Sequence, residues 1–311
     1  MRVFVYEYLT ATGTGRDPAS PDHGIFREGR AMRDAVAADF ARIPGVQVTS
    51  AEDEAFRRAT REAEFALVIA PEFDGILEAR ARWAAEEGAL LLGPSPEAIH
   101  FTADKAALAD HWRECDIPTP ATSTREPTAC EAFPVVWKPR DGCGSTATFL
   151  LRNTFDLASA RAKRAAEGHT GPMILQEFVP GVAASVALLV GVAGIFPLVP
   201  CLQRLSDDGR FQYLGGELPI APALADRAVN LAMRAVECVP GLRGYVGVDL
   251  VLGESRDWAI EINPRLTTSY VGLRELATFN IAEAMLRVAS GQHPGPMPWH
   301  AGPVRFAASG T

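Results

Sequence analysis

The sequence has no excess of positive charge. Its 311 residues include 30 Lys and Arg against 38 Asp and Glu, which gives a formal net charge of −8 at pH 7. The basic residues form no block of the kind that nucleic-acid-binding domains present to phosphates. Nucleic acid is therefore not an expected partner.

Cysteine is scarce and irregularly placed. The chain has an odd number of cysteines with no metal-ligand spacing, namely Cys115, Cys130, Cys143, Cys201 and Cys238. Such a pattern favours reduced thiols in a cytoplasmic protein. Cys143 has no histidine near it in the sequence, so we expect it to fill space in its loop rather than act as a nucleophile.

Long hydrophobic runs are almost absent. The N-terminal segment 1–7 is too short and too soon charged for a secretion signal. Residues 182–202 carry no charge over a length that could span a bilayer, but glycine and proline interrupt them. We therefore expect two buried strands joined at 192–194, and no membrane segment.

The first part of the chain alternates strands with helices, which predicts a parallel sheet covered by helices on both faces. The expected strands are residues 2–9, 46–48, 65–70 and 89–92. Residues 10–24 are expected to form a loop, and Met32, Val36, Phe40 and Ile43 to form the buried stripe of a helix. We divide the chain into an N-terminal unit (1–94), a second unit (95–175) and a third unit (176–311), whose Pro/Gly-rich tail is expected to pack loosely.

Near the C-terminal end, two apolar runs predict an antiparallel hairpin. Residues 246–252 and 258–263 flank the turn-rich segment 253–257. With a five-residue loop, Leu252 would face Trp258 across the hairpin.

This register places two carboxylates directly opposite each other. Asp249 faces Glu261, and Asn263 lies on the same face because side chains alternate along a strand. Like charges in this position destabilise a hairpin unless a cation lies between them, and such oxygen ligands suit Mg²⁺, with Mn²⁺ as a substitute. Taken alone, the acidic pair is equally compatible with an ordinary solvated face. The opposite face is predicted to be apolar, with Val248, Leu250, Leu252, Trp258, Ile260 and Ile262.

A second motif carries positive charge into a glycine loop. Lys138 ends an apolar strand and is followed by Gly142, Gly144 and Ser145. A lysine on a rigid strand provides charge for phosphate oxygens, and the glycines let backbone N–H groups surround them. The loop lacks the ending of a P-loop, and its plainer interpretation is a surface turn after a strand.

Together with the segment Ile-Glu-Ile-Asn-Pro-Arg at 260–265, these motifs resemble the ATP-grasp superfamily. The resemblance runs from Lys105 to Arg265 and implies the α/β ATP-grasp fold. In that fold a Rossmann-like parallel unit precedes two α+β subdomains that enclose ATP. Many members are dimers, which suggests a homodimer.

The resemblance also implies roles for individual residues. Arg265 and Lys138 would be catalytic, with Arg265 stabilising the oxyanion. Ser185 stands where the family often has an acidic residue near the ribose. The implied Mg²⁺ ligands are Asp249, Glu261 and Asn263. The implied ATP contacts are Lys105, Lys138, Gly142, Gly144, Ser145, Glu177, Phe178, Val179 and Ile260.

The activity that follows from this resemblance is ATP-dependent amide formation from a carboxylate and an amine, through an acyl phosphate. Shorter segments resemble a group of ligases of methanofuran and methylofuran biosynthesis, which join the γ-carboxylate of glutamate to an aromatic amine such as tyramine or tyrosine. That similarity implies a substrate pocket containing Glu7, Thr10, Gln203, Gly215 and Gly216.

Three alternatives share the fold. A ligase for other amino acids would differ only in its substrates. A kinase or carboxylase would share the nucleotide site and release ADP without an amine. A non-catalytic ATP-binding regulator would have lost a metal ligand, whereas all three are retained here.

Overall fold

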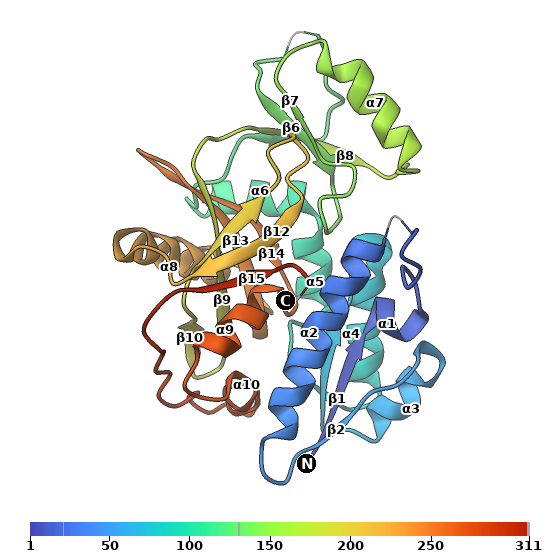
Figure 1. The fold of residues 1–311 in the computed structure, drawn as a ribbon, viewed down its shortest axis with the longest axis vertical. Coiled ribbons are helices and arrows are strands. Elements are labelled where there is room, and N and C mark those ends of the chain that lie inside the picture. Colours follow the sequence, from blue (N-terminus) through green and yellow to red (C-terminus); the bar gives the residue numbers. More distant parts are fainter. Residues whose placement is uncertain (21, 130, 310–311) are drawn as a thin grey trace.

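The computed structural model describes residues 1–20, 22–129 and 131–309, so Cys130 lies outside the described part (Figure 1). The N-terminal unit is built on an all-parallel sheet in the order β2-β1-β3-β4. Its strands are β1 (Arg2–Glu7), β2 (Gln47–Thr49), β3 (Phe65–Ile69) and β4 (Leu90–Leu91). Its helices are α1 (Tyr8–Thr12), α2 (His23–Ala41), α3 (Phe56–Arg61) and α4 (Ile76–Glu86), with 3₁₀ turns η1 (Asp53–Ala55) and η2 (Phe73–Gly75).

Alternation along β1 explains why helices cover both faces of this sheet. Val3 and Val5 pack with the buried side of α2, where Met32, Val36 and Phe40 lie as predicted. Phe4 and Tyr6 point to the other face and pack with α3 and α4. Successive side chains of β1 therefore point to opposite faces of the sheet, and both sets are buried under helices.

The loop predicted from residue 10 begins instead with a short helix. The carboxylate of Glu7 accepts hydrogen bonds from the backbone N–H groups of Leu9 (3.0 Å) and Thr10 (2.8 Å), which caps α1. The strand ends at Glu7 rather than at residue 9, because the Glu7 carboxylate accepts the backbone N–H groups that begin the helix.

The described part of the second unit contains three helices and a small antiparallel sheet in the order β5-β8-β6-β7. The side chains of Ser95 and Asp104 cap its first two helices. In Figure 1 this sheet stands at the top of the molecule with α7 over one face. The elements are α5 (Pro96–Ala103), α6 (Lys105–Glu114), β5 (Thr122–Ser123), β6 (Val135–Pro139), β7 (Phe149–Leu151), α7 (Asp156–Ala166) and β8 (Met173–Glu177).

The third unit is a seven-stranded sheet in the order β14-β13-β9-β11-β12-β15, with β10 paired to β9. The charge-free segment forms two strands separated by a turn, as predicted, and no helix among the described residues is long and apolar enough to cross a membrane. Its strands are β9 (Val182–Gly191), β10 (Gly194–Pro197), β11 (Cys201–Leu205), β12 (Tyr213–Leu218), β13 (Gly244–Leu252), β14 (Asp257–Asn263) and β15 (Val304–Ala307). Its helices are α8 (Pro222–Glu237), α9 (Ser269–Leu276) and α10 (Ile281–Ala289).

The C-terminal tail does not pack loosely, and this prediction was wrong. Strand β15 pairs with β12 and ends the large sheet, and the Phe306 ring is only 5% exposed. The ring packs against Gly272 and Gly216, where added methyl groups would lie 2.4 and 2.7 Å from its atoms. A four-residue strand with one buried aromatic is therefore enough to fix the tail.

The hairpin of β13 and β14 has the predicted functional pair but a different loop. Asp249 pairs with Glu261, and Gly247 with Asn263, as expected. Leu252 faces Asp257 rather than Trp258, because the connection contains only residues 253–256. A β-bulge between Asp249 and Leu250 absorbs the missing residue and restores the pairing.

Because of the bulge, the apolar face of the hairpin contains different residues from those predicted. Ile260, expected on the face opposite the carboxylates, lines the same cavity as Glu261. Trp258 pairs with Val251 and is not part of the buried cluster behind the hairpin. The buried face instead comprises Val246, Val248, Leu250, Leu252, Ala259 and Ile262.

Candidate active site

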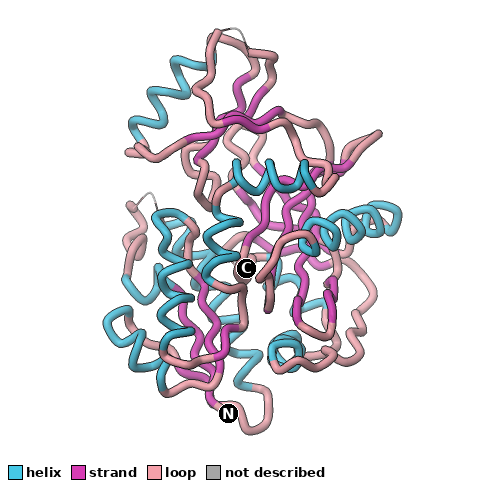
Figure 2. The backbone as a smooth tube through the Cα atoms, turned by 180° about the vertical axis from the view of Figure 1, so that it is seen from behind, coloured by secondary structure: helices cyan, strands magenta, loops and turns pink. Residues whose placement is uncertain are grey.

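A cavity of about 560 Å³ opens between the small sheet of the second unit and the large sheet of the third. Figure 2 shows from behind how the small sheet stands above the large one. All residues implied as contacts for ATP or metal line this cavity, as do Arg265 and Gln203. Elements distant in sequence, α6, β6, β8 and the β13–β14 hairpin, therefore converge on one volume.

One end of the cavity is positively charged. The Lys105 ammonium, at the first turn of α6, donates to the Gly142 carbonyl at 2.8 Å and lies 3.5 Å from a Glu261 oxygen. Lys138, on β6, is 8% exposed, and burial together with the charge of Lys105 lowers its pKa to about 8 despite the opposing effect of Glu261. Two largely desolvated amines therefore lie at this end of the cavity, with Glu261 as a shared acidic neighbour.

The glycine loop after β6 folds over this end. Gly144 has φ +65°, and a methyl group there would lie 2.9 Å from Ile25 of α2. The Ser145 hydroxyl donates to the Phe211 carbonyl at 2.7 Å. The loop therefore touches both the N-terminal and third units. Burial raises the pKa of the Cys143 thiol to about 12, which keeps it protonated and fits a space-filling role.

The paired carboxylates lie beside the lysines. The Asp249 carboxylate accepts from the Gln203 amide (2.9 Å) and the Asn263 amide (3.1 Å). Burial and the charge of Glu261 raise the pKa of Asp249. Burial acts to raise the pKa of Glu261 as well, but the charges of Lys105 and Lys138 hold it below its usual value. Two partly buried carboxylates in direct register, with an amide oxygen beside them, are a donor set that fits Mg²⁺.

Sequence reasoning did not identify two acidic residues that flank Arg265. The guanidinium forms an ion pair with Glu72, Nε to Oε1 at 2.9 Å, and these two atoms lack hydrogen-bond alignment. Glu28 of α2 lines the cavity, and burial raises its pKa to about 7 although Arg265 and the Thr268 hydroxyl oppose the shift. Glu72 follows β3. Ligands of open α/β sheets bind beyond the carboxyl ends of the strands, so this position is the sequence feature that could have identified Glu72.

The N-terminus of α9 completes the cavity wall. Thr267, Thr268 and Ser269 all line it, and the hydroxyls of Thr267 and Ser269 are hydrogen-bonded to each other at 2.8 Å. A helix N-terminus directs unpaired N–H groups and partial positive charge outward, so this wall suits an anionic group.

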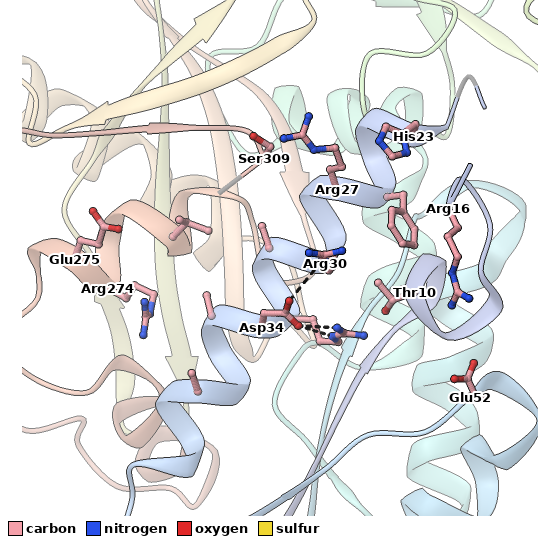
Figure 3. A pocket seen from close by; sticks show the side chains of 16 residues that line it. Thr10, Arg16, His23, Arg27, Arg30, Asp34, Glu52, Arg274, Glu275 and Ser309 are labelled. Atoms are coloured by element: carbon pink, nitrogen blue, oxygen red, sulfur yellow. Dashed lines mark hydrogen bonds and ion pairs between the residues drawn. The ribbon is translucent and has the colours of Figure 1, made fainter. Parts of the chain in front are cut away.

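The predicted substrate residues do not all gather here. Of the predicted substrate residues, only Gln203 lines the cavity that holds the proposed ATP and metal contacts. Glu7 lies at a small adjoining recess that shares Glu28 and Arg265 with the cavity, and its two oxygens cap α1. Thr10 lines a separate cavity of about 950 Å³ beside α2, where Figure 3 shows it near Arg16.

Gly215 and Gly216 serve strand packing rather than the cavity, which they do not line. A methyl group on Gly215 would lie 2.1 Å from the Phe306 carbonyl oxygen, and one on Gly216 would lie 2.5 Å from Cys201 Sγ. Both positions need glycine because β11 and β15 approach β12 closely. The prediction that they contact substrate is corrected accordingly.

The chain is similar in sequence to known proteins. Residues 102–269 match the model of the ATP-grasp domain, and residues 29–99 match that of the pre ATP-grasp 3 domain. The chain is 28% identical to the tyramine–L-glutamate ligase of Methanocaldococcus fervens, over 93% of this chain and 94% of that enzyme. It is 31% identical to the enzyme of that name from Methanocaldococcus jannaschii, over 74% of this chain and 64% of that enzyme.

Among solved structures, the chain is similar to an ATP-grasp superfamily protein from Archaeoglobus fulgidus. The TM-score is 0.75 at 26% identity, covering 96% of this chain and 90% of that one. The ATP-grasp model alone covers more than half of the chain and contains every residue predicted to contact nucleotide or metal. The chain therefore belongs to the ATP-grasp family.

Proposed function

We propose that the protein is an ATP-dependent ligase that joins the γ-carboxylate of glutamate to an aromatic amine, tyramine or tyrosine. The observation that carries this proposal is one cavity lined by two lysines, by facing carboxylates and by an arginine that is ion-paired with Glu72. The substrate pair is suggested by the similarity over nearly the full chain to enzymes called tyramine–L-glutamate ligase. The product would serve biosynthesis of a methanofuran- or methylofuran-type cofactor.

Lys105, Lys138 and the glycine loop would bind the phosphates of ATP, and the segment from Glu177 to Val179 would contact the adenine. Asp249, Glu261 and Asn263 would hold Mg²⁺, and the bound ion would neutralise phosphate charge. The amides of Gln203 and Asn263 keep the Asp249 carboxylate oriented. The lysines would compensate further charge, since Lys138 is buried on β6 and the Lys105 side chain, only 10% exposed, is held by the Gly142 carbonyl.

The reaction has two steps. A carboxylate oxygen of glutamate attacks the γ-phosphorus, the bond to ADP breaks, and an acyl phosphate forms. The amine nitrogen then attacks the acyl carbon, loses a proton, and displaces phosphate that retains one oxygen of the original carboxylate. The Arg265 guanidinium, oriented by Glu72, would stabilise the oxyanion of the second step.

The second step needs a base, because the amine enters as an ammonium ion. Glu28 meets the requirement: it lines the cavity, lies near Arg265 and has a pKa raised to about 7 by burial. A base with a pKa near the working pH is both deprotonated and able to take a proton. We assign the binding and deprotonation of the amine to this carboxylate.

The anionic α-carboxylate of glutamate would lie against the N-terminus of α9. There, Thr267, Thr268 and Ser269 provide hydroxyl and N–H donors. This arrangement would direct the γ-carboxylate toward the phosphates while the amine approaches from Glu28. We also propose a homodimer, which sedimentation would test.

The proposal is tested by ADP release from Mg²⁺-ATP across a grid of carboxylates and amines, with product mass as a second readout. Release that requires both glutamate and tyramine or tyrosine, with a γ-glutamyl amide as product, is expected. Release without any amine would identify a kinase or carboxylase. ATP binding without release across the grid would point to a regulator.

A further inference from the structure

The end of α6 farthest from Lys105 brings together a histidine and two cysteines. His111, Cys115 and Cys238 each offer one ligand atom, and these three atoms all lie within 4.8 Å of one another. His111 and Cys115 are four residues apart and so share a face of α6, while Cys238 ends α8. The cysteines have no metal-ligand spacing in the sequence, so only the packing of two helix ends reveals the cluster.

The two helix ends are held in register by hydrogen bonds on both sides of the cluster. The Trp112 indole N–H donates to the Ala235 carbonyl at 3.0 Å, and Arg234 donates to the Asp116 carbonyl at 2.8 Å. The edge of the Phe101 ring packs on the His111 imidazole, with centroids 5.3 Å apart. Hydrogen bonds outside the three candidate ligands therefore fix the position of the end of α6 relative to the end of α8.

The spacing matches a tetrahedral metal. His111 Nε2 lies 3.7 Å from Cys115 Sγ. Around Zn²⁺, with Zn–S near 2.3 Å and Zn–N near 2.0 Å, these two ligand atoms would be roughly 3.5 Å apart. All three side chains are partly exposed, so an ion can enter and water can occupy a fourth position. Thiolates with an imidazole favour Zn²⁺ over the Mg²⁺ that oxygen ligands select.

We propose that His111, Cys115 and Cys238 bind one Zn²⁺ that clamps α6 to α8. Binding releases one proton from each thiol; His111 gives up the contact of its Nε2–H with the Cys238 carbonyl, now 2.8 Å, and carries its ring proton on Nδ1 instead, so that Nε2 can bind the metal. The site lies roughly 9–15 Å along the helix from Lys105, and none of its three residues lines the ATP cavity. Its role is structural, since it fixes the helix whose other end carries Lys105.

The test begins with the metal content of the purified, reduced full-length chain, followed by titration with Zn²⁺ and with Co²⁺ as a spectroscopic probe. We expect one equivalent of Zn²⁺, thiolate-to-Co²⁺ charge-transfer bands and a higher melting temperature with Zn²⁺. Cys115→Ser, Cys238→Ser and His111→Ala should each lose roughly 100-fold or more in affinity, because even residues behind metal ligands contribute about 10–100-fold. Cys201→Ala and His100→Ala are matched controls that should bind normally.

Circular dichroism and ATP binding would verify that each variant folds. The proposal is overturned by a reduced wild-type chain that binds neither ion tightly, or by a Cys115→Ser/Cys238→Ser double variant that keeps the Co²⁺ bands. A disulfide between Cys115 and Cys238 in the purified chain, with no metal affinity after reduction, would also overturn it. None of these outcomes depends on ligase activity, so the test is independent of the proposed function.

Discussion

Replacing Glu28 by glutamine should make the protein more stable and the enzyme slower. Burial raises the pKa of Glu28 from 4.5 to about 7, so the folded state binds its proton more tightly than the unfolded state does. Stability is therefore lost as the pH rises from 4.5 through 7, since ionisation then opposes folding. The difference corresponds to roughly 3 kcal/mol. Glu28→Gln should be more stable than wild type by up to about this amount above pH 7.

The catalytic effect has the opposite sign. A base that accepts the proton of the amine contributes about 10²–10⁴-fold to the rate. We expect kcat of Glu28→Gln to fall by a factor in this range. In the wild type, kcat should rise with pH through about 7 as Glu28 loses its proton. The variant should lose this rise.

Urea unfolding well below and well above pH 7 measures the first effect, and initial rates of amide formation over the same range measure the second. Glu283→Gln, on the exposed face of α10, is the matched control and should change neither. Equal stability of Glu28→Gln and wild type above pH 7, together with an unchanged pH–rate profile, would refute the assignment of Glu28. Lower stability without loss of the pH-dependent rise would show that the carboxyl group only supports the fold.

Three further substitutions test other parts of the account. Asp249→Asn should lower the affinity for Mg²⁺-ATP roughly 100-fold or more, which a Mg²⁺ titration measures. The same substitution should make the ligand-free protein more resistant to urea at alkaline pH, because burial and the charge of Glu261 disfavour the charged form of Asp249. Urea unfolding measures this second effect. Gln203→Ala should raise the KM for Mg²⁺-ATP about 10-fold and leave the KM for glutamate unchanged, because the Gln203 amide holds Asp249. A selective rise in the glutamate KM would return Gln203 to the substrate pocket. Phe306→Ala should lower the free energy of unfolding by about 3–5 kcal/mol, whereas a loosely packed tail would leave urea unfolding unaltered.

The convergence of the proposed metal ligands and phosphate contacts on one cavity was predictable from the sequence, because each of these residues lies on a short segment with its own pattern. The hairpin illustrates how far such reasoning goes. Asp249 and Glu261 pair as predicted, but the loop is one residue shorter and a bulge compensates. The shorter loop and the bulge have opposite effects on the register, so the Asp249–Glu261 pair is kept. The alternation of apolar and polar residues reveals neither the loop length nor the bulge. For this reason the prediction from strand alternation placed Ile260 on the wrong face of the hairpin.

The acidic partners of Arg265 were not predictable, because they come from a different unit. Glu28 lines the cavity and Glu72 pairs with Arg265 only when α2 and the segment after β3 pack against the third unit. The same holds for the cluster of His111, Cys115 and Cys238, where only the four-residue spacing on α6 is visible in the sequence. Contacts between distant segments depend on tertiary packing, which local propensity does not encode.

The most direct test of the central claim follows oxygen through the reaction. Glutamate labelled with ¹⁸O in its γ-carboxylate is incubated with the protein, Mg²⁺-ATP and tyramine, and the released phosphate is examined by mass spectrometry. Activation of the carboxylate as an acyl phosphate predicts that one labelled oxygen passes to phosphate for each amide formed. Amide formation with unlabelled phosphate, or phosphate release without amide, would contradict the account.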